Sequence, residues 1–236
     1  MCTVSFVYSN GKTIITSNRD EKVLRESAIE PRNYCINNKN ILFPKDPKAG
    51  GTWFAVDENA NVLVLLNGAD EKHKVLLPYR KSRGLIVLDI ISSSSPKDFW
   101  NEIDLENIEP FTLVLFQNSQ LFQLRWNGNQ KETLVLNECK NHVWSSATLY
   151  SKEIREKRSE WFYSFLEKIT FPSAIEMFHF HRNTEKENLE NGLVINRNEE
   201  MKTLSITQAI FEKNKAEVAH HDLITNLSFE TTFLIL

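Results

Sequence analysis

Short runs of β-branched and aromatic residues alternate with turn-forming residues in the first third of the chain. Thr3–Tyr8 and Thr13–Asn18 flank Asn10-Gly11, a pair that readily adopts the positive φ angles of a tight hairpin turn. Thr52–Val56 and Val62–Asn67 form a second pair, and their consecutive apolar residues indicate that both faces of the sheet are covered. The pattern predicts two β-hairpins, the second at a central position in a sheet.

Helical patterns follow in two parts of the chain. Ser82–Ile91 and Pro96–Ile103 are predicted helices, the latter with Ser95 as its N-cap and proline at the first helical position. Ser151–Lys168 combines a capping serine, a charged face and an apolar stripe. Pro172–His181 is predicted to form another helix.

The rest of the chain predicts strands and one polar excursion. Arg182–Glu200 is polar apart from Leu193–Ile195, and we expect it to form a mobile excursion. Strands, then helices, then strands, without regular alternation or a glycine-rich phosphate loop, favour an α+β fold in one domain over residues 1–236. The further predicted strands are Phe111–Gln117, Gln120–Trp126, Thr133–Leu136, Thr203–Phe211, Glu217–His221 and Ser228–Leu236.

Composition narrows the classes of function. The 236 residues carry 28 basic and 31 acidic side chains, and a net charge of -3 offers no basic field for nucleic acid. No apolar run approaches the ~20 residues of a membrane span, and no secretory signal is visible, so we expect a cytoplasmic protein. Cys2, Cys35 and Cys139 stand in no ligand-like spacing, which argues against disulfides and zinc.

The dipeptide Met1-Cys2 is the most informative chemical feature. Removal of the initiator methionine would leave Cys2 with a free α-amine beside its own thiol. An α-amine with a pKa of about 7.7 can be neutral near pH 7 and accept the thiol proton, so one residue would supply nucleophile and base. Taken alone, a cysteine at this position is better explained as an ordinary residue near the chain start.

Polar residues at the end of the second predicted strand provide partners for Cys2. The segment Asn18-Arg19-Asp20-Glu21 follows the apolar part of that strand. Because the two strands of a hairpin run antiparallel, residues 18 to 20 should arrive beside Cys2. Asp20 can then accept a hydrogen bond from the α-amine, and Arg19 can stabilise a thiolate or bind a substrate carboxylate. Without Cys2 opposite, a surface turn would explain the segment as well.

The second hairpin contributes glycines and an amide. Gly50-Gly51 precedes Thr52 and Trp53, and two glycines permit close backbone approach. Asn67 ends the following strand, and its side-chain amide can donate to a developing oxyanion. An ordinary Asn-Gly turn is the alternative for that position.

Together these blocks resemble the NRDE-domain proteins, also called the transport and Golgi organisation protein 2 family. The match is specific from Met1 to about residue 90 and thins beyond it. The family looks like a branch of the N-terminal nucleophile hydrolase fold, which implies a four-layer αββα sandwich with mainly antiparallel sheets. The matching segments are Met1-Cys2-Thr3, Asn18-Arg19-Asp20-Glu21, Gly50-Gly51-Thr52-Trp53, Leu66-Asn67-Gly68 and Ser82-Arg83-Gly84.

The resemblance also implies a reaction. The family is similar in arrangement to cysteine-dependent conjugated bile acid and penicillin V acylases, which implies hydrolysis of a linear amide by acyl transfer, without a cofactor or metal. The implied catalytic residues are Cys2, Arg19, Asp20 and Asn67. The implied substrate-binding residues are Asn18, Gly51, Thr52, Trp53 and Arg83.

Two segments depart from the family pattern and leave a second hypothesis open. A Leu-Ser-Asn segment of the relatives is here Trp144-Ser145-Ser146-Ala147, and a Gly-Thr-Arg-like segment is Lys202-Thr203-Leu204. The alternative keeps the fold and discards the reaction: a carrier or trafficking protein for haem or a lipid-like small molecule in the same cleft.

Histidine pairs are the candidate haem or metal ligands. His179 and His181 are two positions apart on a predicted helix, and His220 and His221 are adjacent on a predicted strand. Such pairs diverge in direction, so structural or solvent-facing roles are favoured over chelation.

Overall fold

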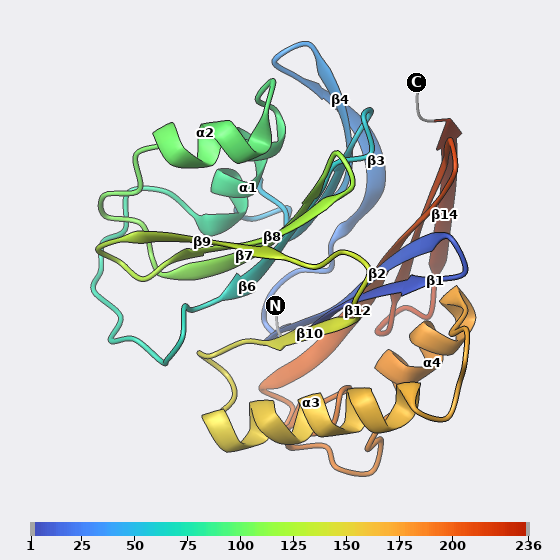
Figure 1. Ribbon diagram of the computed structural model, residues 1–236. Coiled ribbons are helices and arrows are strands. Elements are labelled where there is room, and N and C mark those ends of the chain that lie inside the picture. The colour runs from blue at the N-terminus through green and yellow to red at the C-terminus, as the bar shows by residue number, and fades with distance from the viewer. Residues whose placement is uncertain (1–2, 235–236) are drawn as a thin grey trace.

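The computed structural model describes residues 3–234, in two seven-stranded sheets stacked face to face (Figure 1). Every strand pairing is antiparallel. The first sheet has the order β10 (His142–Ser145), β1 (Thr3–Ser9), β2 (Lys12–Lys22), β12 (Met201–Glu212), β13 (Lys215–Asp222) and β14 (Ser228–Leu234), with β11 (Asn196–Arg197) paired to β12. The second runs β3 (Ile29–Ile36), β4 (Lys39–Lys45), β5 (Phe54–Asp57), β6 (Val62–Asn67), β7 (Phe111–Gln117), β8 (Gln120–Trp126) and β9 (Lys131–Leu136).

Helices cover both outer faces. α1 (Arg83–Ile91) and α2 (Pro96–Glu102) pack on β5, β6 and β7 of the second sheet. α3 (Lys152–Leu166) and α4 (Ala174–Asn183) pack on β10, β2 and β12 of the first sheet. The layers are therefore helix, sheet, sheet, helix, which confirms the predicted αββα sandwich of the α+β class (Figure 1). None of the helices among residues 3–234 is long and apolar enough to cross a membrane.

Two hydrophobic layers hold the sandwich together. Val4 and Ile15 belong to the core between the sheets. Val7 and Ile14 belong to a smaller core under α3 and α4, where they meet Phe180. Since side chains alternate along a strand, odd-numbered residues of β2 face the other sheet and even-numbered residues face the helices. This alternation decides where each polar residue of β2 points.

The first hairpin forms as predicted, but its second strand is longer. Asn10 and Gly11 have φ angles of 49° and 76° and close the turn between β1 and β2. The predicted strand ended at Asn18, whereas β2 continues to Lys22 because β12 pairs along its whole length, with Met201 opposite Lys22. The polar segment after Asn18 is thus part of a buried strand rather than a turn that follows it.

Other differences concern segments with weak patterns. β3, β4 and β10 were not predicted; β3 is a polar edge strand, and β10 has only four residues. The segment 182–200, expected to be mobile, is anchored, because Leu193 and Ile195 are fully buried. Arg158 of α3, which is also fully buried, donates from Nε to the carbonyl oxygen of Asn191 over 3.2 Å. The polar segment 182–200 therefore packs against the helix layer.

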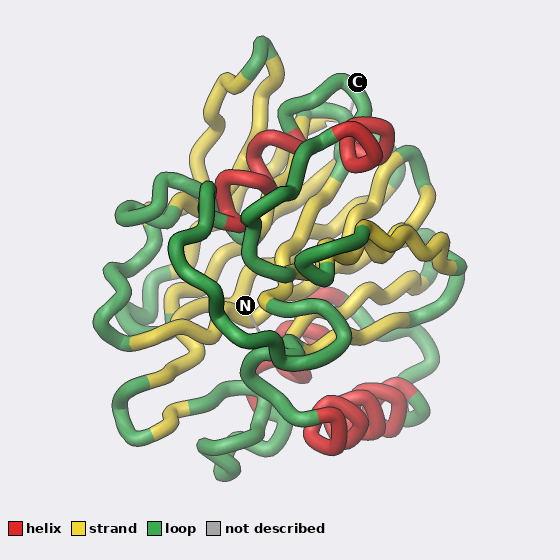
Figure 2. The backbone as a smooth tube through the Cα atoms, turned by 90° about the vertical axis from the view of Figure 1, so that its left-hand side faces the viewer, coloured by secondary structure: helices red, strands yellow, loops and turns green. Residues whose placement is uncertain are grey.

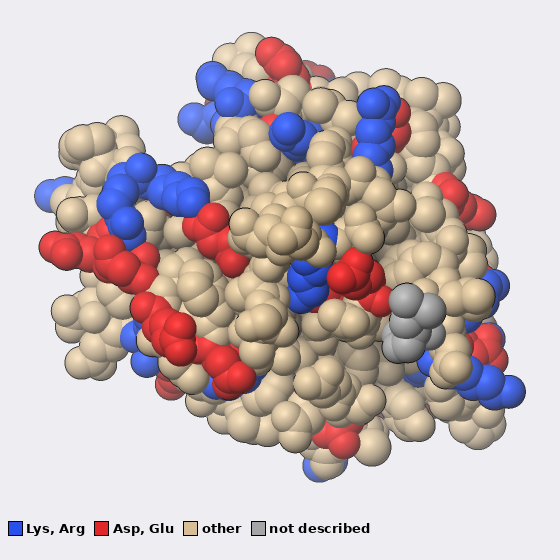
Figure 3. Space-filling view, turned by 90° about the horizontal axis from the view of Figure 1, so that it is seen from above, with Lys and Arg blue, Asp and Glu red and all other residues tan. Residues whose placement is uncertain are grey.

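Charged side chains on one face of the molecule do not gather by sign. In the space-filling view, basic and acidic residues are interspersed among neutral ones without a continuous basic stripe (Figure 3). The mixture of positive and negative side chains on this face agrees with the small net charge of -3.

Candidate active site

A cleft of about 790 Å³ opens at one end of the sandwich. Its walls come from β2, from the segment between β4 and β6, and from the loop that leads into α1. Loops cross in front of the strand ends on the side of the molecule that Figure 2 faces. Six of the implied catalytic and substrate-binding residues line this cleft: Arg19, Gly51, Thr52, Trp53, Asn67 and Arg83.

Arg19 is fixed rigidly on one wall. It is an odd-numbered residue of β2 and therefore faces the second sheet. Its Nη2 lies 3.1 Å from Oδ2 of Asp46, and its guanidinium stacks 4.1 Å from the centre of the Trp53 ring. The side chain is only 4% exposed, and this burial lowers the pKa of Arg19, although the Asp46 carboxylate opposes the shift. Arg19 is a preorganised cation at the cleft surface.

Asp46 is a residue of the site that the sequence did not indicate. Its Oδ1 accepts hydrogen bonds from the amides of Lys48 and Ala49 at 3.0 and 2.8 Å, and its Oδ2 accepts from Nε of Arg25 at 2.9 Å. Burial alone would raise the pKa of Asp46, but these hydrogen bonds and the charges of Arg25 and Arg19 outweigh it and hold the pKa below its usual value. An aspartate at the start of a turn is the signal that would have found it.

Removing the charge of Asp46 should loosen this wall. In Asp46→Asn, two arginines lose their shared carboxylate, and we expect the free energy of unfolding to fall by about 2 kcal/mol in urea denaturation at neutral pH. The matched control is Asp104→Asn, because the Asp104 and Arg80 side chains are 66% and 48% exposed and their ion pair should contribute less than about 0.5 kcal/mol. Equal losses in the two variants would contradict the anchoring role.

Gly51 and Thr52 attach the cleft floor to α1. The amide of Thr52 donates to the carbonyl oxygen of Gly84 over 3.1 Å, and its hydroxyl donates to the carbonyl oxygen of Pro44 over 2.7 Å. A Cβ atom on Gly51 would lie 2.6 Å from the amide nitrogen of Leu85. The segments Gly50-Gly51-Thr52-Trp53 and Ser82-Arg83-Gly84 are thus in direct backbone contact. Thr52 is a structural residue as well as a cleft-lining one.

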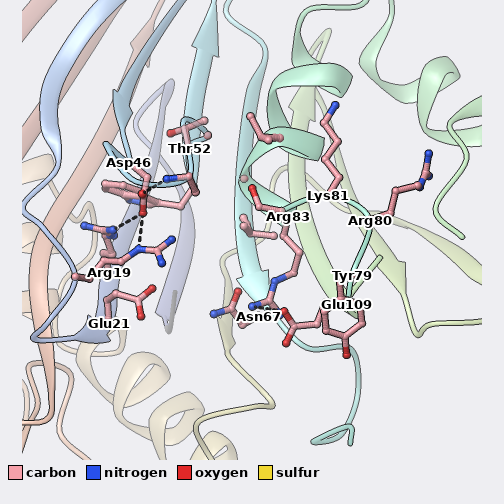
Figure 4. A pocket seen from close by; sticks show the side chains of 18 of the residues that line it. Arg19, Glu21, Asp46, Thr52, Asn67, Tyr79, Arg80, Lys81, Arg83 and Glu109 are labelled. Atoms are coloured by element: carbon pink, nitrogen blue, oxygen red, sulfur yellow. Dashed lines mark hydrogen bonds and ion pairs between the residues drawn. The ribbon is translucent and has the colours of Figure 1, made fainter. Parts of the chain in front are cut away.

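Asn67 lies on the wall opposite Arg19. It ends β6, and its side chain points into the cleft near Arg83 (Figure 4). Its backbone carbonyl accepts a hydrogen bond of 2.7 Å from Oγ of Ser146. Ser146, which belongs to one of the two segments that depart from the expected family pattern, therefore supports the backbone of Asn67.

Arg83 and Glu109 form the far side of the cleft. Nη2 of Arg83 lies 3.1 Å from Oε2 of Glu109, and its Nη1 donates to the carbonyl oxygen of Pro110 over 3.2 Å. Burial lowers the pKa of Arg83, with Glu109 opposing the shift. Nε2 of His73 lies 3.2 Å from the same carboxylate. The guanidinium group of Arg83 is therefore a cation whose orientation in the cleft is fixed by Glu109 and the carbonyl oxygen of Pro110.

Asp20 and Asn18 face away from the cleft because they are even-numbered residues of β2. Asp20 accepts hydrogen bonds from Tyr150 Oη at 2.8 Å and from Thr203 Oγ1 at 2.5 Å. Asn18 is fully buried, and its Nδ2 donates to the carbonyl oxygens of Leu193 and His181 at 2.7 and 3.1 Å. The structure thus places Asn18 away from the position of a substrate contact that the resemblance implied.

The predicted nucleophile, Cys2, lies outside the described residues. Thr3, to which it is bonded, pairs with Asn18 in β2 and with Ser145 in β10. The antiparallel register therefore places Asn18 opposite the first described residue, with Arg19 and Asp20 following. Cys35 and Cys139 are both exposed and lie in neither wall of the cleft.

Stacked antiparallel sheets between helix layers, with a cleft at the end of the sandwich, define the N-terminal nucleophile hydrolase fold class. A variant of the conjugated bile acid hydrolase from Clostridium perfringens matches with a TM-score of 0.63 and 12% identity, covering 98% of this chain and 92% of that one. The N-acylethanolamine-hydrolyzing acid amidase orthologue from Caenorhabditis elegans matches with a TM-score of 0.64 and 11% identity, covering 88% and 92%.

The family follows from the sequence itself. The model of the family Transport and Golgi organisation 2 matches residues 1–224, and the chain belongs to this family. A search of curated proteins gave no significant match.

Proposed function

We propose that this protein is a cysteine-type N-terminal nucleophile hydrolase that cleaves a linear amide bond. The observation that carries the proposal is the meeting of Arg19, Trp53 and Asn67 in one cleft next to the strand that begins at Thr3. These residues come from three separate sequence blocks, and the fold alone does not require that they meet in one cleft.

The proposed reaction has two halves. With Met1 removed, the α-amine of Cys2 takes the thiol proton, and the sulfur attacks the amide carbon, forming a C–S bond and an oxyanion that the Asn67 amide stabilises. The C–N bond then breaks, and the proton passes from the α-ammonium to the leaving amine. Water attacks the thioester, releasing a carboxylic acid and restoring the thiol. From the helix side of β2, Asp20 orients the amine at the start of the neighbouring strand, and Arg19 provides positive charge on the cleft side.

The cleft lining favours a substrate with both a negative charge and an apolar part. Five basic residues and three acidic ones line it, and Leu65, Leu77, Pro78 and Tyr79 add apolar surface. Arg25 uses only its Nε on Asp46, so its remaining N–H groups are available to a carboxylate. The solved neighbours named above include a conjugated bile acid hydrolase and an N-acylethanolamine-hydrolyzing amidase, which supports an acyl amide as the substrate class.

The test measures whether Met1 has been removed, how fast Cys2 reacts, and whether the protein hydrolyses an amide. Intact mass should show loss of Met1, and iodoacetamide near neutral pH should alkylate Cys2 faster than the exposed Cys35 and Cys139. N-acyl-p-aminobenzoates with short, medium and long acyl chains should release p-aminobenzoate. Cys2→Ser should lower this rate at least about a thousandfold, and Asn67→Ala about a hundredfold.

The Cys35→Ser, Cys139→Ser double variant is the matched control and should retain full activity. Retention of Met1 on the purified protein would defeat the mechanism, since the α-amine of Cys2 would never form. So would a Cys2 that reacts no faster than the two surface thiols.

The second candidate is a carrier that binds a small molecule in the same cleft without cleaving it. The observation in its favour is Ser146, whose hydroxyl supports the Asn67 backbone instead of offering a second amide to an oxyanion. Haem held by histidine fits the described residues poorly, because no histidine lines the cleft. Both ring nitrogens of His181 already make hydrogen bonds, to Ser5 and to Asn18. Tight binding of an N-acyl-p-aminobenzoate without turnover would favour the carrier.

A further inference from the structure

A second, smaller cavity of about 160 Å³ lies beside the edge strand β10. Arg125 reaches it from β8, Arg155 reaches it from the first turn of α3, and Ser145 lies on β10 between them. Leu66 of β6 and Gly68, directly after that strand, line this cavity, whereas Leu65 and Asn67 of β6 line the large cleft. The two spaces are therefore separated by the end of β6, and neither arginine belongs to the proposed hydrolase site.

The two arginines share an unusual feature. Nε of Arg125 and Nε of Arg155 are both buried, and neither has a hydrogen-bond partner. Arg125 is partly neutralised through Nη1 by the exposed Asp70 and Glu132. Among the described residues, Arg155 has no carboxylate within ion-pairing distance. Two guanidinium groups with an unpartnered Nε thus line one cavity, and one of them carries a positive charge that no described carboxylate pairs with.

The other polar groups of the cavity do not satisfy these donors. The hydroxyl of Thr112 donates to the carbonyl oxygen of Gly68 over 3.0 Å, and that of Ser146 donates to the carbonyl oxygen of Asn67. A buried donor without a partner costs about 1 to 3 kcal/mol, so two in one cavity point to a group that is bound there. The complement of N–H donors and positive charge is an anionic acceptor.

We propose that this cavity binds a small oxyanion, a phosphate or a carboxylate group, between the guanidinium groups of Arg125 and Arg155. Guanidinium binds such groups through directed N–H donors and stays charged at all working pH values. The volume equals about five water molecules at their liquid volume of about 30 Å³, which accommodates one such group with some water. The site would be distinct from the cleft and would function whether or not Cys2 is a nucleophile.

The test uses inorganic phosphate and acetate on the full chain at constant ionic strength, with chloride as the reference. Calorimetric titration should give saturable one-to-one binding of one of the two anions, and the preferred anion shows whether the natural group is a phosphate or a carboxylate. Arg155→Met keeps the aliphatic stem but removes the charge, and it should weaken binding more than tenfold. Lys157→Met is the matched control, because it removes an exposed charge from the same helix, and it should bind like the wild type.

A second readout does not depend on the variants folding. In the wild-type protein, the Nε–H nuclear magnetic resonance signals of Arg125 and Arg155 should shift together as the anion is added, with one common midpoint. Absence of saturable binding by either anion would overturn the proposal and leave water as the occupant. Equal weakening in Arg155→Met and Lys157→Met would also overturn it, because the effect would then be one of net charge alone.

Discussion

Gly51→Ala is expected to destabilise the protein by about 3 kcal/mol or more, although it adds only one methyl group. The added Cβ would lie 2.6 Å from the amide nitrogen of Leu85 and 2.7 Å from the carbonyl oxygen of Gly84. Both are backbone atoms at the start of α1, so relief requires the helix to move rather than a side chain to rotate. The measurement is urea unfolding at neutral pH.

The neighbouring residue provides the control. Gly50 has a φ angle of +71° and nothing within 4 Å of its Cβ position, so Gly50→Ala should cost only the left-handed backbone penalty of about 1 kcal/mol. Because Gly51 lies in the cleft wall, the same displacement of α1 should also disturb Arg83 and weaken ligand binding. If the two alanine variants proved equally stable, the close contact between the cleft floor and α1 would be absent.

Acidification from about pH 7 to about pH 5 is expected to remove about 4 kcal/mol of stability through two buried histidines. Burial, together with the charge of Arg158, lowers the pKa of His181 to about 3. Burial lowers the pKa of His220 to about 4, with Asp222 opposing the shift and His221 and Arg19 adding to it. Each imidazole binds its proton more readily in the unfolded chain, where the pKa is about 6.5.

The sign follows from that difference. The stability that the neutral histidines contribute is complete above about pH 6.5 and is lost as the pH falls towards the folded-state values. The contribution of each histidine to the free energy of unfolding falls by about 2 kcal/mol between pH 7 and pH 5. Denaturant unfolding at several pH values in this range measures the loss. His220→Asn should halve the slope of stability against pH, whereas His179→Asn should leave it unchanged, because His179 is only weakly tied to its own helix at the surface. A flat profile would contradict the prediction, because it would show that the two imidazoles have the same pKa in the folded and the unfolded chain.

Local sequence signals account for most of the fold. The Asn10-Gly11 turn, the capping serine of α3 and the continuous apolar runs of β6 and β7 all predicted elements that the structure contains. The sequence did not predict β10, because its four half-buried residues have no alternation that distinguishes an edge strand from a loop. The extension of β2 to Lys22 was missed for a different reason, since it depends on β12, far away in the sequence.

The cleft was predicted in part. The sequence blocks identified Arg19, Trp53, Asn67 and Arg83, but they did not indicate Asp46, because its role depends on Arg25 and Arg19 meeting it in space. Nor could residue type alone show that Arg19 and Asp20 serve different sides of the sheet. In a strand, odd- and even-numbered side chains point to opposite faces of the sheet. The faces of Arg19 and Asp20 could therefore be assigned only once this segment was known to belong to β2.

The strand β2 therefore acts as a partition between two compartments. Its odd-numbered residues Arg19 and Glu21 belong to the wet, charged space that meets small molecules, and its even-numbered residues Asn18 and Asp20 belong to the internal scaffold under the helices. Substitution of the odd-numbered Arg19 or Glu21 should consequently change which molecules are retained, whereas substitution of the even-numbered Asn18 should change whether the layers stay together. Two neighbouring polar residues can thus be lost with opposite consequences.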